Sequence, residues 1–197
     1  MAIAFALSTQ PAERVRADVL AVPMFDGGRP GPGADLLQAA LGDGLAAFMA
    51  EAGFTGKRDE TLVVPAGAGR KAAVLVGLGE RGTVSTDQLR RAAAAVARAA
   101  SRARSVVTTL LAGAPDLDPG AAAQALAEGF ALGSYRFLTY KSDGEASKLR
   151  RVTVVGDAGA PTRAGLGRGV AVAEAVAWAR DMVNEPSGAK KKKAEKS

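Results

Sequence analysis

The chain has 197 residues, of which 48% are hydrophobic and 5% aromatic, and its formal net charge is +6. This composition allows a domain with a substantial core, and the absence of cysteine and histidine excludes a disulfide framework, a thiolate nucleophile and the commonest general base. Residues 187–197 carry four of the six net charges, because they hold five lysines and one glutamate, so the rest of the chain is close to neutral.

Apolar runs alternate with amphipathic segments along most of the chain. In chain order the predicted elements are a strand at 3–7, a strand at 18–25, a helix at 34–52, strands at 61–65 and 72–76, a helix at 85–104, a strand at 105–111, a helix at 119–132, a strand at 151–155 and a helix at 163–184. Several strands are continuous apolar runs, which suits strands covered on both faces. The pattern predicts an α/β fold, a three-layer α/β/α domain with a mixed, mainly parallel sheet.

A glycine- and proline-rich loop at 26–33 joins the second strand to the first helix. Free amides and the positive end of a helix dipole make such a loop a candidate phosphate site. Residues 18–42 resemble in arrangement the ligand loop of macro domains, which bind ADP-ribose, although Pro30 and Pro32 each remove an amide donor. A plain turn or a contact surface is therefore the favoured interpretation of this loop. The candidate ligand residues are Asp26, Gly27, Gly28, Gly31 and Gly33.

A second glycine-rich segment, GLGERG at Gly77–Gly82, satisfies the dinucleotide-binding pattern and lies between a predicted strand and a predicted helix. That function also needs an acidic residue about twenty positions later, for the ribose hydroxyls. Residues 97–104 contain three arginines and no acid. A tight strand-to-helix turn is therefore the favoured interpretation of this segment.

Arg91, Arg98 and Arg102 form a stripe on the predicted 85–104 helix. The stripe is a candidate nucleic-acid contact, although such stripes are more often the solvated face of an amphipathic helix. The chain has no apolar stretch long enough to span a membrane, and its start is typical of a strand rather than a signal peptide. We therefore expect a cytoplasmic protein with no membrane partner.

Five segments together resemble the N-terminal domain of the leucyl aminopeptidases (cytosol aminopeptidases), the M17 metallopeptidase family. The resemblance covers almost all of residues 1–186. The segments are GKRDE at 56–60, VLVGLGE at 74–80, DQLRRAAAAVARA at 87–99, AEGFALGSYRFLTYKS at 127–142 and WARDMVNEP at 178–186.

This resemblance implies a two-domain hexameric enzyme whose N-terminal domain has a macro-like fold. Its C-terminal domain would hold two divalent metals, Mn or Zn, that activate a water for attack on the N-terminal peptide bond of a substrate. The family's metal-binding motifs have no counterpart in this sequence. We therefore expect no catalytic residue, metal or cofactor in this chain, and no activity from it alone.

The resemblance predicts three parts: a macro-like domain at 1–162, a linking helix at 163–186 that leads toward an absent catalytic domain, and a disordered lysine-rich tail at 187–197. The expected function is a non-catalytic role in assembly or regulation. The expected partners are the catalytic domain and neighbouring copies in a homo-oligomer. Two alternatives stay open: a macro-type module that binds ADP-ribose or phosphate at 26–33 and 156–169, and a nucleic-acid-binding domain that uses the arginine stripe and the tail.

Overall fold

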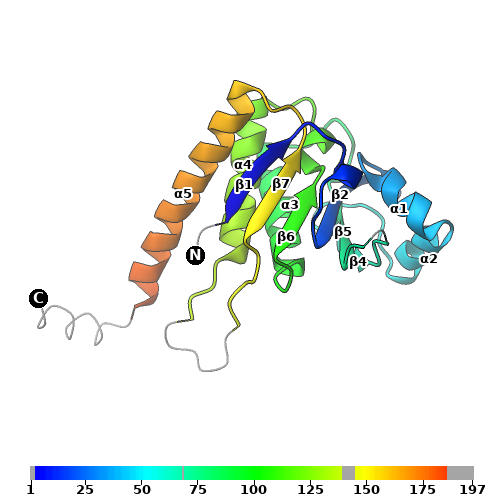
Figure 1. Cartoon of the computed structure of the whole chain (residues 1–197), viewed down its shortest axis with the longest axis horizontal. Coiled ribbons are helices and arrows are strands. Elements are labelled where there is room, and N and C mark those ends of the chain that lie inside the picture. The colour runs from blue at the N-terminus through cyan, green and yellow to red at the C-terminus, as the bar shows by residue number, and fades with distance from the viewer. Residues whose placement is uncertain (1–2, 68, 139–144, 186–197) are drawn as a thin grey trace, which may run out of the picture.

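The computed structural model describes residues 3–67, 69–138 and 145–185, and it places a β-sheet between layers of helices (Figure 1). The strands are β1 (Ala4–Ser8), β2 (Val19–Phe25), β3 (Arg29–Pro30), β4 (Thr61–Val64), β5 (Ala72–Gly77), β6 (Ser105–Thr108) and β7 (Arg151–Val155). The helices are α1 (Ala34–Leu41), α2 (Gly44–Glu51), α3 (Thr86–Ala99), α4 (Pro119–Ser134) and α5 (Ala160–Asn184), with 3₁₀ turns η1 (Ala12–Arg14) and η2 (Leu110–Gly113). The predicted lysine-rich tail lies outside the described residues.

The sheet runs in the order β1-β7-β6-β2-β5-β4, with β3 beside β2. Neighbouring strands from β1 to β5 in this order are parallel, whereas β4 and β3 pair antiparallel with β5 and β2. All seven residues of β2 are buried, as expected for a central strand covered on both faces. The predicted mixed, mainly parallel sheet is confirmed.

Two hydrophobic clusters lie on opposite faces of this sheet. One joins Phe25 and Val152 of the sheet to Leu89 of α3 and Phe130 of α4. The other joins further strand residues, such as Leu20, to the side chains of α1 and α2. Figure 1 shows α5 beside α4 at the β1 end of the molecule. The three-layer α/β/α arrangement is therefore confirmed, with α5 added outside α4.

Four predicted elements differ clearly from the structure. The helix predicted at 85–104 ends at Ala99. The helix predicted at 34–52 is broken at Gly42, whose φ of 54° and ψ of −133° are not helical, so α1 and α2 are separate. The strand predicted at 105–111 ends at Thr108, whose hydroxyl accepts a hydrogen bond from the Leu110 amide as η2 begins. The last helix begins at Ala160, three residues earlier than predicted, with a proline in its first turn.

Glycines allow α4 to pack closely between α3 and α5. A Cβ on Gly129 of α4 would lie 2.2 Å from the Arg90 carbonyl oxygen of α3. A Cβ on Gly165 of α5 would lie 2.1 Å from the Gly120 carbonyl oxygen of α4. Gly133 of α4 and Gly169 of α5, one turn later in each helix, lie similarly close to the backbones of α3 and α4. These contacts bring helix backbones together at distances that no other residue permits.

Asp18 ties together the amino-terminal ends of three strands. Its carboxylate accepts hydrogen bonds from the amides of Arg104 (2.7 Å) and Ser105 (3.2 Å), and it lies 3.0 Å from the Lys71 ammonium nitrogen. The hydrogen bond from the Arg104 amide and the one from Lys71 hold the pKa of Asp18 below its usual value, although partial burial opposes them. The ionised carboxylate therefore stabilises the folded state.

We expect Asp18→Asn to lower the free energy of unfolding by about 1 kcal/mol at neutral pH, because the variant loses charge-assisted hydrogen bonds. A lowered folded-state pKa contributes stability above the unfolded-state pKa, and that contribution is lost as the pH falls through the folded-state pKa. Urea unfolding of wild type and variant should therefore converge as the pH falls below about 4. Asp116→Asn, at an exposed turn, is the control; a difference for Asp18→Asn that persists at low pH would contradict the assignment.

No helix within the described part of the chain is both long and apolar enough to cross a membrane.

Candidate functional site

Helix α5 is buried along one side only. Its first half packs on α4 through Gly165, Leu166 and Gly169, and Ala173 continues the buried side. The helix ends at Asn184, and Pro186, which follows Glu185, is unfavourable for a continuing helix. The second half is attached to the domain mainly along the side that faces α4, β1 and the segment after α4.

The side of this second half that is turned away from α4, which we call the outer face of α5, is apolar and exposed, and Trp178 at its edge also lines the cavity described below. Side chains on it include Trp178, Met182 and Val183, which are 66%, 46% and 83% exposed. Four residues of this face, Ala171, Ala175, Trp178 and Met182, are spaced by four, three and four residues. In coiled coils this spacing directs side chains toward a neighbouring helix. The outer face consists of Ala171, Val172, Ala175, Trp178, Ala179, Met182 and Val183. Large apolar side chains exposed in one patch mark an interaction surface.

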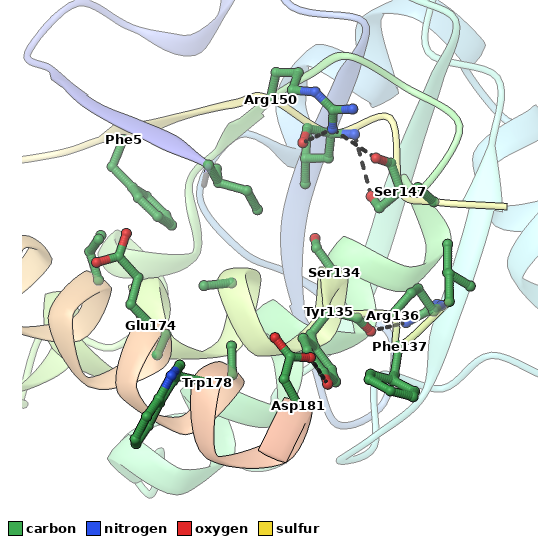
Figure 2. Close-up of a pocket in the computed structure, with 18 residues that line it drawn as sticks. Phe5, Ser134, Tyr135, Arg136, Phe137, Ser147, Arg150, Glu174, Trp178 and Asp181 are labelled. Carbon is green, nitrogen blue, oxygen red and sulfur yellow. Dashed lines mark hydrogen bonds between the residues drawn. The ribbon is translucent and has the colours of Figure 1, made fainter. Parts of the chain in front are cut away.

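A cavity of about 560 Å³ lies between β1, the end of α4, the chain at 135–138 and 146–150, and α5 (Figure 2). Its apolar wall includes Ile3, Phe5 and Leu149. Phe5 also meets Phe130 edge to face, with 6.4 Å between ring centroids, which fixes β1 against α4. The cavity is thus bounded by elements distant in sequence.

Charged side chains of both signs line this cavity. Glu174 and Asp181 stand on α5, and Figure 2 shows both carboxylates on the side of the helix toward the cavity. Asp181 accepts a hydrogen bond of 2.6 Å from the Tyr135 hydroxyl. Burial and this bond to a carboxylate raise the pKa of Tyr135. Arg136 and Arg150 line the cavity from the segments that follow α4 and precede β7.

The predicted phosphate loop is a tight hairpin between β2 and β3. Gly27 and Gly28 take φ values of 77° and 70°, which this turn requires. The amides of Asp26, Gly28 and Gly31 donate to the carbonyls of Gly79, Thr55 and Pro23. Gly33 precedes α1 with a φ of 87°.

Three of the five candidate residues in that loop therefore already use their amide donors inside the protein. The adjoining cavity of about 500 Å³ is lined largely by apolar side chains, among them Leu45, Met49 and Phe54. Phosphate or ADP-ribose binding at this loop stays a prediction, and these contacts do not strengthen it.

In the neighbouring turn at 55–60, a carboxylate of the protein itself occupies the backbone amides. The Glu60 carboxylate accepts hydrogen bonds from the amides of Thr55 (2.7 Å) and Lys57 (3.2 Å). Burial opposes ionisation of Glu60, but these hydrogen bonds outweigh it and lower its pKa. The same turn covers the GLGERG segment, since the amides of Gly77 and Gly79 donate to carbonyls of Glu60 and Gly56. The segment forms the tight turn that the sequence favoured.

The predicted arginine stripe is exposed but does not lie wholly on one helix. Arg91 and Arg98 belong to α3, whereas Arg102 follows in the turn before β6. Arg91 donates to Asp87 with a distance of 2.9 Å from its Nε, and it lies 3.7 Å from Asp59. Two carboxylates thus offset part of the positive charge of the stripe. Nucleic-acid contact stays a prediction.

The residues that line the cavity were not predicted as a site. Glu174, Trp178 and Asp181 are spaced by four and three residues, which places them on one side of a helix, so their clustering could have been found from the sequence. The contribution of β1 and of residues 135–138 and 146–150 could not be predicted, because it depends on the tertiary fold.

Nor do the described residues offer a metal centre. No group of three or more aspartate, glutamate, histidine or cysteine side chains among them could hold a metal ion. Divalent metals need several converging oxygen ligands or their nitrogen and sulfur equivalents. These residues therefore do not fit a pair of catalytic metals.

Comparison with known proteins gives a consistent result. A family model described as the N-terminal domain of the cytosol aminopeptidase family matches residues 21–144. The probable cytosol aminopeptidase of Rhodococcus erythropolis is 35% identical over 184 residues, which cover 87% of this chain and 35% of that protein. Its counterpart in Streptomyces avermitilis is 35% identical over 208 residues, covering 93% and 39%.

Solved structures agree with these relatives. The bottromycin maturation enzyme BotP matches with a TM-score of 0.68 and 34% identity, over 88% of this chain and 34% of that one. A mutant of tomato leucine aminopeptidase matches in fold with a TM-score of 0.78 at 24% identity, over 94% of this chain and 39% of that one. This chain thus spans well under half the length of the proteins that it matches. The chain belongs to the cytosol aminopeptidase family, and it corresponds to the family's N-terminal domain.

Proposed function

We propose that this chain is the non-catalytic N-terminal domain of a leucyl aminopeptidase-type metallopeptidase, with a role in assembly or regulation. The activity of the whole enzyme would be the release of N-terminal amino acids from peptides in the cytoplasm. The two divalent metals, Mn or Zn, would lie in a separate catalytic domain. The match covers only 35% and 39% of two relatives named as probable cytosol aminopeptidases, which supports a separate catalytic part in such proteins.

The outer face of α5 carries the proposal, because it is the surface best suited to meet that catalytic domain or a neighbouring copy in a homo-oligomer. Its side chains include an exposed tryptophan, and tryptophan is enriched among residues that dominate binding energy. Its alanines would let a partner helix approach closely. The charged residues of this part of α5, Glu174, Arg180 and Asp181, lie on other sides of the helix, so the outer face itself carries no charged group.

Docking can be tested with the catalytic part of the Rhodococcus erythropolis relative, prepared without its own N-terminal part. We expect this chain to bind it in analytical ultracentrifugation, and Trp178→Ala to weaken binding by about 10-fold or more. Phe48→Ala is the matched control, because Phe48 is also an exposed apolar residue but lies on α2. Equal binding by both variants, or none by the wild type, would contradict docking through this face.

The non-catalytic assignment has a separate test. The chain alone, supplied with Mn²⁺ or Zn²⁺, should not hydrolyse a leucine amide substrate above the rate without protein. Metal-dependent turnover that copurifies with the folded chain would overturn the assignment, whatever the docking experiment gives.

A further inference from the structure

We infer that the cavity between β1, α4 and α5 binds a free amino acid or short peptide that has an apolar side chain and carries both its ammonium and carboxylate groups. The inference rests on the cavity alone and goes beyond the proposed docking role. A volume of about 560 Å³ lies in the range of pockets that take small ligands. Such pockets combine an apolar lining with a few polar groups that orient the ligand.

The acidic side of the cavity suits an ammonium group. Glu174 and Asp181 stand two turns apart on α5, with Trp178 between them. Asp181 is held in place by the Tyr135 hydroxyl, yet a carboxylate has further acceptor capacity after that one bond. Two carboxylates that face the same cavity favour a positively charged group between them.

Two arginines that line the cavity suit a carboxylate. Nη1 of Arg136 donates to the carbonyls of Gly133 and Tyr135, and Nη1 of Arg150 donates to those of Ser147 and Leu149. These bonds fix each guanidinium, and because the group has five donors, each arginine keeps donors for a ligand.

The cavity also has a hydroxyl group, that of Ser134, without a hydrogen-bond partner among the described residues. Ser134 lines the cavity, and its Oγ is buried. An unpaired buried hydroxyl is unfavourable, so a ligand that bonds to it gains affinity.

These features together select the ligand class. Ile3, Phe5, Leu149 and Val170 give an apolar wall for an aliphatic side chain. The two carboxylates disfavour a phosphorylated ligand by charge repulsion, and the two arginines disfavour a simple amine. A zwitterion with an apolar side chain can place its ammonium group at the carboxylates and its carboxylate at the arginines.

The test uses L-leucine and the dipeptide Leu-Leu, with N-acetylleucine and leucine amide as analogues that lack one charge each. Trp178 is the only tryptophan of the chain and lines the cavity, so its fluorescence reports binding directly. We expect leucine or Leu-Leu to bind with a Kd on the order of 1 mM or tighter, and each capped analogue to bind about 10-fold more weakly. The stronger of the two uncapped ligands shows whether an amino acid or a peptide is preferred.

Two variants tie the binding to the cavity. Glu174→Gln and Arg150→Gln should each weaken binding about 10-fold, whereas Glu51→Gln on α2 and Arg16→Gln after η1 should leave it unchanged. Thermal unfolding without ligand checks that every variant is folded. Absence of a fluorescence change and of calorimetric heat at about 10 mM ligand, equal binding of the capped analogues, or equal loss in the control variants would overturn the inference. No catalytic part is present in these experiments, so they fail or succeed independently of the docking test.

Discussion

Replacing Gly165 by alanine is expected to lower the free energy of unfolding by about 3 kcal/mol. The added Cβ would lie 2.1 Å from the Gly120 carbonyl oxygen, and that atom belongs to the backbone of α4. Backbone cannot rotate away as a side chain can, so α5 must move off α4 and open the packing along both helices. Thermal and urea unfolding followed by circular dichroism would measure the loss.

The same helix offers a matched control. Gly167 is exposed, and a Cβ on it would have no atom within 4 Å outside its own helix. Gly167→Ala should therefore stabilise the protein by about 0.5–1 kcal/mol, because alanine favours the helix and glycine loses more entropy on folding. The two substitutions are chemically identical and two residues apart. If Gly165→Ala were as stable as Gly167→Ala, the close contact between α4 and α5 would be wrong.

The second large effect is expected at the ion pair that joins α3 to α4. The Nε of Arg90 lies 2.7 Å from the Glu128 carboxylate, whose side chain is only 8% exposed, whereas that of Arg90 is 37% exposed. Arg90→Met would leave the carboxylate with Gln124 as its remaining hydrogen-bond partner among the described residues. We expect a loss of about 2 kcal/mol, less than for a fully buried pair because water reaches one partner.

A double-mutant cycle separates this pairing from simple loss of packing. Glu128→Met alone leaves a partly exposed arginine, which water can solvate, so its cost should be smaller than that of Arg90→Met. The double variant should recover most of the stability, since two methionines can pack between the helices. Strictly additive losses across the cycle, measured by urea unfolding, would show that the two side chains are not coupled.

Local sequence signals predicted much of the fold. The helices predicted to begin at 85 and 119 begin at Thr86 and Pro119, and the structure shows their caps: Ser85 and Gln88 form a capping box ahead of α3, and Asp118 caps α4. The continuous apolar run of β2 predicted a strand buried on both faces. Each of these signals acts over a few residues, and the tertiary structure agrees with it.

The candidate ligand sites were harder to predict, because their state depends on distant segments. The glycine loop at 26–33 has the residues of an anion cradle, but carbonyls of Thr55 and Gly79 take up amides that a ligand would need. The cavity beside α5 is the converse case. Its walls come from β1, the end of α4 and the chain before β7, and only the α5 residues show a local pattern.

The two attachments of α5 give the helix a mechanical property. Gly165 fixes it near its start, and the hydrogen bond from Tyr135 to Asp181 fixes it near its end. Sixteen residues of helix separate these points by about 24 Å. A helix that is held at two points so far apart resists tilting. A structure joined to the end of α5 would therefore have a fixed orientation relative to the sheet.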